Sequence, residues 1–247
     1  MRSLFALLRG VYERLYGALC GVPPFPVRPW HFKWLTIVEL QRDLREVAGR
    51  LEGRVLDVGC GKQPYRSWLT AARDYVGADV EPGPGVDAVI RPGQSWPLPD
   101  ASFDSVLCTQ VLEHDSDPVH TLGEIDRVLA PGGTAVISVP FAYNEHMAPH
   151  DYRRWSAAGV SADVATRFDV VEVRKQGPVG SLLGALWLNW IEHVIGRNRW
   201  LQLARALAFP LWILYTGAVN AAARAIDALD RTGAFYLNVL VVAKKRQ

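Results

Sequence analysis

Short apolar and β-branched runs recur through the middle of the chain. They cover residues 55–58, 74–80, 105–109 and 134–140. Runs of this kind are typical of strands buried on both faces of a parallel sheet. Between the last two runs, residues 117–130 carry apolar side chains at helical spacing. The alternation of strand and helix patterns predicts an α/β fold.

The helix expected between the last two runs has signals at both ends. Asp117 stands at the N-cap and Pro118 at the first helical position, where each residue type is favoured. Apolar side chains recur every three or four positions up to Leu129, and a Pro-Gly-Gly sequence follows at 131–133. Proline and glycine end helices, so the helix is expected to stop at 131–133.

The segment VLDVGCGKQPY, residues 55–65, carries the first candidate chemistry. Asp57 lies in the expected strand, and Gly59 and Gly61 form the turn after it. Glycine lets the backbone come close to a ligand, although tight turns also use glycine for structural reasons alone. Asp79 closes the next apolar run, about 20 residues further on, where a carboxylate can bind both ribose hydroxyls. This spacing predicts a nucleoside-containing cofactor at the carboxyl edge of a parallel sheet.

The same segment argues against a dinucleotide. The G-x-G-x-x-G pattern would seat a pyrophosphate on a helix N-terminus, but Pro64 stands at the third glycine. The negative charge of Asp57 would oppose a pyrophosphate and suits a ligand that carries an amine. S-adenosylmethionine has a ribose, an adenine, an ammonium and a sulfonium, and no phosphate. The segment resembles motif I, D-x-G-x-G, of the class I S-adenosylmethionine-dependent methyltransferases.

Later segments extend the resemblance over residues 51–175. SFDSVLCTQVLEH, a helix ending RVLAPGG and the strand TAVISVP follow in the order and spacing of the methyltransferase family often named type 11. The resemblance implies a Rossmann-like seven-stranded sheet with a final antiparallel strand and helices on both faces. The last two strands come from 168–176 and 235–245, and an apolar helical insertion separates them. HMAPHDYRRWSAAGV is similar to segments of methyltransferases from bacterial surface-glycan and secondary biosynthetic pathways.

The resemblance also implies roles for individual residues. An aspartate in the first strand acts through the methionyl ammonium, the turn supplies backbone, and the second aspartate holds the ribose. The implied cofactor-binding residues are Asp57, Gly59, Cys60, Gly61, Asp79, Val80 and Gln110. The family commonly has an aspartate near adenine where this chain has Pro92, so the adenine amino group needs another acceptor.

Methyl transfer to a hydroxyl benefits from a general base. The candidates are His114, His146, His150 and Asp151, all in loops expected at the carboxyl side of the sheet. A structural hydrogen bond is the alternative for His114, and a clasp onto a neighbouring arginine is the alternative for His150 and Asp151. No metal site is expected, because Pro149 prevents the helical spacing that a pair of histidines would use.

Charge is distributed unevenly along the chain. Residues 1–54 carry nine Lys/Arg and five Asp/Glu, residues 55–173 carry 8 and 17, and residues 174–247 carry ten and three. An acidic core between two basic flanks indicates a polyanionic partner, either nucleic acid or an anionic membrane.

The flanks favour the membrane over nucleic acid. Residues 177–191 and 206–223 contain no charged residue, and four of the nine tryptophans lie at 187, 190, 200 and 212. Tryptophan and arginine at the edges of apolar runs are typical of a lipid headgroup region. Pro210 and Gly217 interrupt the second run, so an interfacial segment is expected rather than a true span. A buried helical cap or a homodimer interface is the alternative.

The N-terminal segment agrees with this expectation. Leu4, Leu8, Val11, Leu15 and Leu19 line one helical face, as in amphipathic interfacial helices. Charged residues interrupt any signal-peptide core, and the three cysteines imply no disulfide framework. The expected location is the cytoplasmic side of the inner membrane, peripheral or monotopic.

The expected organisation has three parts. Residues 1–50 form amphipathic helices and a proline-rich connector, residues 51–176 and 233–247 form the methyltransferase domain, and residues 177–232 form the insertion. The expected function is O-methylation of a glycan, a lipid-linked sugar or another amphipathic metabolite. The alternatives are a methyltransferase of a soluble metabolite, with the insertion as lid or dimer interface, and a non-catalytic membrane scaffold.

Overall fold

The computed structural model describes residues 2–247, with side chains from Leu7 onward. It divides into two units. The helical unit contains the residues up to Gln41 together with Gly177–Leu237, and the sheet unit contains Arg42–Gln176 and Asn238–Gln247. The N-terminal helix and the insertion, expected as separate segments, therefore belong to one unit. The side chain of Leu4, expected on the apolar face of the first helix, lies outside the described residues.

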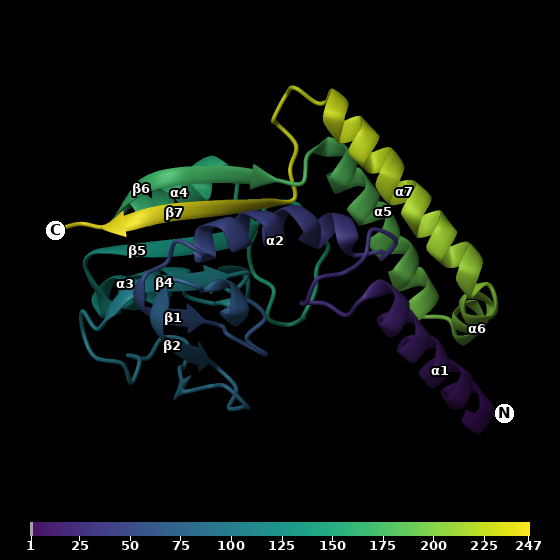
Figure 1. The fold of residues 1–247 in the computed structure, drawn as a ribbon, viewed down its shortest axis with the longest axis horizontal. Helices are drawn as coiled ribbons and strands as arrows, with labels where there is room; N and C mark the ends of the chain where they lie inside the picture. Colours follow the sequence, from purple (N-terminus) through teal and green to yellow (C-terminus); the bar gives the residue numbers. More distant parts are fainter. Residues whose placement is uncertain (1) are drawn as a thin grey trace. The chain divides into compact units, whose positions relative to one another are not determined.

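The sheet unit is built on seven strands in the order β3-β2-β1-β4-β5-β7-β6 (Figure 1). The strands β1 to β5 pair in parallel, and β7 is antiparallel to both of its neighbours. The expected seven-stranded Rossmann-like sheet with an antiparallel final strand is confirmed. The strands are β1 (Gly53–Val58), β2 (Ala72–Asp79), β3 (Ala88–Val89), β4 (Phe103–Thr109), β5 (Leu129–Pro140), β6 (Phe168–Gln176) and β7 (Asn238–Lys245).

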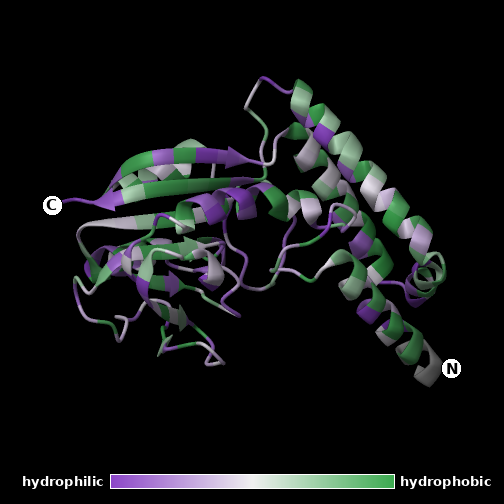
Figure 2. Ribbon diagram, viewed as in Figure 1, coloured by the Kyte–Doolittle hydropathy of each residue, from purple (hydrophilic) through white to green (hydrophobic). Residues whose placement is uncertain are grey.

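Helices cover both faces of the sheet. The helices α3 (Pro118–Val128) and α4 (Ala157–Ala165) pack behind β5, β6 and β7, and the C-terminal half of α2 (Trp34–Ala48) lies in front (Figure 1). Single turns η1 (Arg66–Trp68) and η2 (Leu112–His114) follow β1 and β4. Figure 2 shows β7 hydrophobic along most of its length, as a strand between two neighbours requires.

The end of α3 differs from the expectation at residues 131–133. The helix ends at Val128, and β5 begins at Leu129, which pairs with Phe103 of β4. The ammonium of Lys245 donates to the carbonyls of Asp126 at 2.5 Å and Leu129 at 2.9 Å. A cation that satisfies the last carbonyls of a helix stabilises its end. The sequence pattern could not show this stop, because Lys245 lies on the last strand.

The helical unit consists of α1 (Arg2–Cys20), the N-terminal half of α2, α5 (Val179–Gly196), α6 (Arg199–Leu207) and α7 (Phe209–Leu229). The helices α5 and α7 lie side by side (Figure 1). Small residues allow this close approach. A Cβ at Gly180 would lie 2.1 Å from the carbonyl oxygen of Ala223, and one at Gly184 would lie 3.1 Å from the Ala223 Cβ.

Polar side chains of α7 form hydrogen bonds with the end of the proline-rich connector, residues 22–30, and with the residue that follows it. Thr216 donates to the carbonyl of Trp30 at 2.5 Å, and Asn220 donates to the carbonyls of Pro29 at 2.6 Å and His31 at 3.0 Å. Thr216, Asn220 and His31 are buried, whereas Pro29 and Trp30 are exposed. The connector and the helices between β6 and β7 therefore fold together.

The membrane-spanning capacity of the helices is limited. Among the described residues, no single helix is long and apolar enough to cross a membrane. The helices α6 and α7 together pass the same length and hydropathy test, but the chain bends by 90° between them.

We expect Gly180→Ala to destabilise the protein, because the new methyl group would push α5 away from α7. Overpacking of this kind lowers the free energy of unfolding by about 1–3 kcal/mol, and urea denaturation would measure it. The control is Gly10→Ala in α1, where an added Cβ meets no atom within 4 Å. That change should be neutral or stabilise by up to about 1 kcal/mol. Equal stability of the two variants would contradict this account of the helix contact.

Candidate active site at the carboxyl ends of the parallel strands

The turn after β1 presents open backbone at the carboxyl edge of the sheet. Gly59 has φ of 70° and Gly61 has φ of 48°, and this left-handed region favours glycine. A Cβ at Gly59 would lie 2.3 Å from a methyl group of Val111, which follows β4. A Cβ at Gly61 would meet no atom within 4 Å. The turn is closely packed on the β4 side and open at Gly61, where a ligand can approach.

The second carboxylate meets this turn at the end of β2. Asp79 accepts a hydrogen bond from the Gly61 N–H at 2.8 Å through Oδ2 and one from the Val80 N–H at 2.7 Å through Oδ1. Oδ1 also accepts a hydrogen bond from the Glu81 N–H at 3.3 Å. These three bonds fix the orientation of the carboxylate. They leave a lone pair on Oδ2, whereas Oδ1 can accept from a further donor only in place of the long Glu81 bond. The geometry fits a carboxylate that accepts hydrogen bonds from two ribose hydroxyls beside an open turn.

The first carboxylate lies beneath the turn rather than on its surface. Asp57 in β1 is 1% exposed and accepts a hydrogen bond from the hydroxyl of Tyr75 at 2.7 Å. Burial raises the pKa of Asp57 to about 7, the Tyr75 hydrogen bond acts in the opposite direction, and the nearby charge of Asp79 adds to the rise. A cation brought close to Asp57 would favour its charged form and lower this pKa.

The other implied cofactor residues lie around the same edge. Cys60 is buried, and its N–H donates to the carbonyl of Ala78 at 3.1 Å. The side chain of Val80 is 50% exposed, as expected for an apolar group that can face adenine. Gln110 adopts a positive φ of 55°, and its N–H donates to the Ser138 carbonyl at 2.9 Å. These residues remain predicted cofactor contacts.

The loop after β4 holds a buried acid next to a histidine. Glu113 is completely buried in η2, and neither of its carboxylate oxygens accepts a hydrogen bond from any described residue. Burial raises the pKa of Glu113 to about 8. His114 directs Nδ1 to the carbonyl of His150 at 2.6 Å and Nε2 toward Glu113 Oε1 at 3.9 Å.

The loop after β5 brings a second histidine to this place. The rings of His114 and His146 lie edge to face with their centroids 4.7 Å apart. Nδ1 of His146 lies 3.2 Å from Asp151 Oδ2. Burial lowers the pKa of His146, and the charge of Asp151 acts in the opposite direction. Of the four predicted catalytic residues, His114 and His146 therefore come into direct contact.

Asp151 forms an ion pair with Arg154, which is the structural alternative to catalysis that the sequence left undecided. Its two carboxylate oxygens accept hydrogen bonds from Arg154 at 2.6 and 2.7 Å, and its side chain is 1% exposed. These bonds hold the pKa of Asp151 well below its usual range. A carboxylate this weakly basic positions its neighbours and is a poor proton acceptor. His150 is exposed, and its Nδ1 lies 2.8 Å from the Tyr152 hydroxyl.

The sequence reading missed Glu113 and Tyr75. The signal for Glu113 was present, because it stands next to His114 directly after a buried strand. Tyr75 carries no such signal. Its contact with Asp57 depends on the pairing of β1 with β2, which aligns Val55 with Tyr75.

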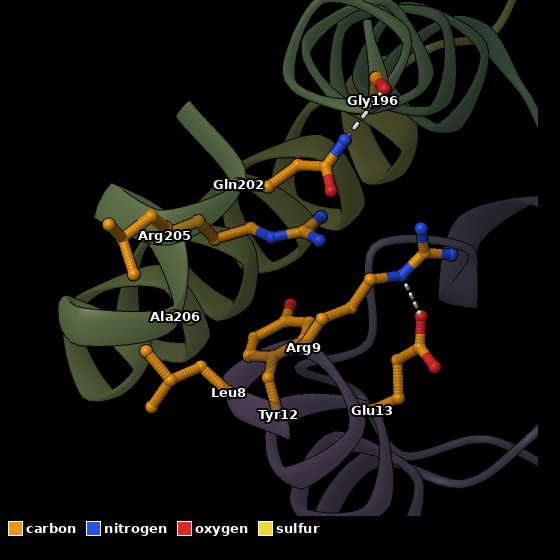
Figure 3. A pocket seen from close by; sticks show the side chains of 9 residues that line it. Leu8, Arg9, Tyr12, Glu13, Gly196, Gln202, Arg205 and Ala206 are labelled. Atoms are coloured by element: carbon orange, nitrogen blue, oxygen red, sulfur yellow. Dashed lines mark hydrogen bonds and ion pairs between the residues drawn. The ribbon is translucent and has the colours of Figure 1, made fainter. Parts of the chain in front are cut away.

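A hollow lies in the helical unit, between α1 and α6 (Figure 3). It encloses about 160 Å³. Arg9 bonds Glu13 at 2.7 Å, and Gln202 donates to the Gly196 carbonyl at 2.7 Å (Figure 3). Arg205 at this hollow pairs with Glu192, but its Nε has no hydrogen-bond partner among the described residues. None of the predicted cofactor residues lines the hollow.

The comparisons with known proteins agree with the geometry of the sheet unit. The family described as "Methyltransferase domain" matches residues 56–137. A probable S-adenosylmethionine-dependent methyltransferase of Mycolicibacterium smegmatis is 40% identical over 110 residues, which cover 39% of this chain and 42% of the relative. An uncharacterized methyltransferase of Mycobacterium sp. (strain JLS) is 37% identical over 94 residues, which cover 34% and 37%. The chain thus spans less than half the length of these relatives.

Solved structures show the same fold at low identity. The [4+2]-cyclase SpnF has a TM-score of 0.54 at 21% identity, covering 86% of this chain and 82% of that chain. A putative methyltransferase in complex with the Haloferax volcanii Trm112 activator has a TM-score of 0.51 at 18% identity, covering 84% and 92%. A cyclase among these structures illustrates that a fold does not set the reaction.

The strand order, the glycine turn with its two carboxylates, and the matched segment all agree. The sheet unit is similar over residues 56–137 to methyltransferase domains, and the relatives of this segment include a probable S-adenosylmethionine-dependent methyltransferase.

Proposed function

We propose that the whole protein transfers a methyl group from S-adenosylmethionine to a hydroxyl of an amphipathic acceptor, a glycan or a lipid-linked sugar, at the cytoplasmic face of a membrane. The observation that carries the cofactor part is the oriented Asp79 carboxylate beside the open turn at Gly61. The observation that carries the membrane part is the set of exposed apolar side chains on neighbouring helices of the helical unit.

Bound S-adenosylmethionine supplies a methyl group that its sulfonium already makes electrophilic. The protein therefore needs mainly to orient the two reactants and exclude water. Asp79 holds the ribose, and Asp57 favours the methionyl ammonium from beneath the turn. Of the three candidate histidines, His150 is the one that we assign as acceptor of the hydroxyl proton. Its side chain is exposed, and among the described residues its hydrogen bonds involve only Nδ1 and the backbone.

Replacing Asp79 tests the cofactor site. Asp79→Ala should weaken S-adenosylhomocysteine binding by roughly 1.5–3 kcal/mol, because two charge-assisted hydrogen bonds to the ribose are lost. Asp79→Asn keeps an acceptor for the Gly61 N–H and should lose less. Isothermal titration calorimetry measures both, and circular dichroism checks the fold. Unchanged affinity in Asp79→Ala would remove this residue from the site.

Cofactor binding should depend on pH through Asp57. Its pKa of about 7 leaves the carboxyl largely neutral at pH 6 and largely charged at pH 8. Because an ammonium prefers the charged form, S-adenosylhomocysteine should bind up to about tenfold more tightly at pH 8. Asp57→Asn should flatten this dependence over the same range. The same pH profile in both proteins would show that another group titrates.

The apolar surface of the helical unit consists of aligned stripes. On α5 the exposed side chains recur at helical spacing, and the same is true at the start of α7. The exposed residues are Leu183, Trp187, Trp190 and Val194 on α5, and Leu207, Leu211, Leu214 and Tyr215 around the start of α7. The indole N–H of Trp187 donates to the Tyr215 hydroxyl at 2.5 Å, which joins the two stripes. Large exposed apolar patches mark interaction surfaces.

Three features favour a lipid occupant for this surface. Tryptophan and tyrosine are enriched at the headgroup level of membranes, and the surface contains Trp187, Trp190 and Tyr215. Arg199 lies over the ring of Trp200 at the start of α6, and residues 174–247 carry ten basic against three acidic residues. On α1, Val11, Leu15 and Leu19 are also exposed, as expected of an interfacial helix.

We expect the protein to float with liposomes that contain anionic lipid, and Trp190→Ser combined with Leu211→Ser and Leu214→Ser to sediment instead. These three side chains are each 58–68% exposed, so their loss should leave the fold intact while removing apolar burial of about 25 cal/mol per Å². The control is Val171→Ser, which changes an equally exposed residue on β6.

Two outcomes of the flotation assay would contradict the membrane proposal. If the intact protein stays with the soluble fraction at low salt, the surface does not bind lipid. If the intact protein then elutes as a dimer in size-exclusion chromatography and the triple variant elutes as a monomer, the surface is an interface between two copies. A soluble acceptor then becomes the better proposal.

A further inference from the structure

We infer that Glu113, His114 and His146 form a binding site for a divalent first-row cation such as Zn²⁺. One ligand atom from each residue lies within 4.8 Å of the other two. Of the four residues predicted as general bases, His114 and His146 belong to this set. Asp151 is bound by Arg154, and His150 turns toward Tyr152.

The distances are close to those of a tetrahedral site. Zn²⁺ bonds of about 2.0–2.1 Å to nitrogen and oxygen place ligand atoms about 3.3 Å apart. His114 Nε2 and Glu113 Oε1 are 3.9 Å apart. Shortening these separations by about 0.6 Å between His114 and Glu113, and by up to about 1.5 Å elsewhere in the set, would complete the geometry around a bound cation. Two histidines and one glutamate leave a fourth position open, which is the arrangement of catalytic rather than structural zinc sites.

The burial of Glu113 is the second, independent observation. The residue is 0% exposed, and both of its carboxylate oxygens lack a hydrogen-bond partner among the described residues. A buried carboxylate without a partner is costly, and buried charges in proteins are paired or coordinate metals. The nearest cationic or potentially cationic groups are otherwise engaged: Arg154 binds Asp151, and His114 binds a carbonyl through Nδ1. A cation held between Glu113 and the two imidazoles would supply the missing partner.

His114 is oriented as a metal-ligating histidine usually is. A carbonyl oxygen only accepts hydrogen bonds, so the 2.6 Å contact with the His150 carbonyl places the proton of His114 on Nδ1. Nε2, which faces Glu113, then carries a free lone pair. A carbonyl partner of this kind fixes ring orientation and raises ligand basicity. The ring of His146 has its Nδ1 3.2 Å from Asp151 Oδ2 but makes no hydrogen bond there, and its backbone N–H donates to the same carboxylate at 2.8 Å.

The site lies next to the cofactor turn. Glu113 and His114 follow β4, which pairs in parallel with β1, so the loops after the two strands meet at one edge. Val111 contacts the position where a side chain at Gly59 would project. The same edge therefore carries both the methyl donor and the cation.

The role of the cation rests on the proposed function. An acceptor hydroxyl in the open position would lose its proton more easily, since a metal lowers the pKa of a bound hydroxyl. The proton passes to His150, the base assigned in the proposed function, and the oxygen forms a bond to the methyl carbon. The bond from sulfur to that carbon breaks with its electron pair left on sulfur, which gives S-adenosylhomocysteine. The acceptor class is then a sugar or phenolic hydroxyl able to bind a metal.

The test uses the full chain, stripped of metal with a chelator and titrated calorimetrically with ZnCl₂ and with MgCl₂. We expect one Zn²⁺ per chain and much weaker Mg²⁺ binding, because imidazole ligands suit zinc. Glu113→Gln and His146→Ala should each weaken Zn²⁺ binding roughly 100-fold or more. Co²⁺ should give the visible absorption of a tetrahedral site in the native protein and lose it in both variants. The controls are Glu52→Gln and His120→Ala, which change residues outside the cluster and should bind Zn²⁺ as the native protein does.

The outcomes separate this inference from the proposed function. If Zn²⁺ binds equally to the native protein and to Glu113→Gln, or binds to neither, the metal site is wrong. Melting temperatures of the variants within a few degrees of the native value exclude unfolding as the cause of lost binding. S-adenosylhomocysteine is titrated into the same samples. Zinc binding without cofactor binding supports the metal site and overturns the methyltransferase proposal, and the reverse result overturns the metal site alone.

Discussion

The antiparallel placement of β7 between β5 and β6 is the pairing on which the rest of the structure depends. Gln176 at the end of β6 pairs with Asn238 at the start of β7. The chain leaves the sheet at the end of β6 and rejoins it at the paired start of β7. The hydrogen bonding between the strands is therefore complete without α5, α6 and α7, which lie between them in the sequence. Residues 239–241 of β7 are fully buried, so the last strand of the chain is also part of the central core.

A completed sheet fixes the edge where the chemistry lies. Because β1, β2 and β4 are parallel neighbours, the loops after them meet, and each contributes one element: the open turn at Gly61, the oriented Asp79, and the buried Glu113. The pairing also explains the electrostatics, since Asp57 and Glu113 are acids held in buried positions, and burial raises the pKa of each. Asp57 accepts a hydrogen bond from Tyr75, and Glu113 accepts none from the described residues, so a bound cation would favour the charged form of each acid.

The sequence predicted the parts whose cause is local. The strands, the Asp117 cap of α3 and the glycine turn follow from apolar runs, capping and spacing, and the structure contains them. Lys245 of the last strand binds carbonyls at the end of α3, and the pairing of Tyr75 with Asp57 depends on strand register. The union of the N-terminal helix with α5–α7 also depends on contacts between distant segments. Residue patterns along a chain carry little information on such contacts, and the same limit hid the position of His146 beside Glu113 and His114.

The central claim is methyl transfer from S-adenosylmethionine to an amphipathic acceptor. The most direct measurement incubates the protein with methyl-labelled S-adenosylmethionine and a total membrane extract of its source cell, then separates lipid from water-soluble products. The account predicts label in the lipid fraction from the native protein and little or none from Asp79→Ala. Label confined to the water-soluble fraction would contradict the amphipathic acceptor, and no label in either fraction would contradict methyl transfer to any component of that extract.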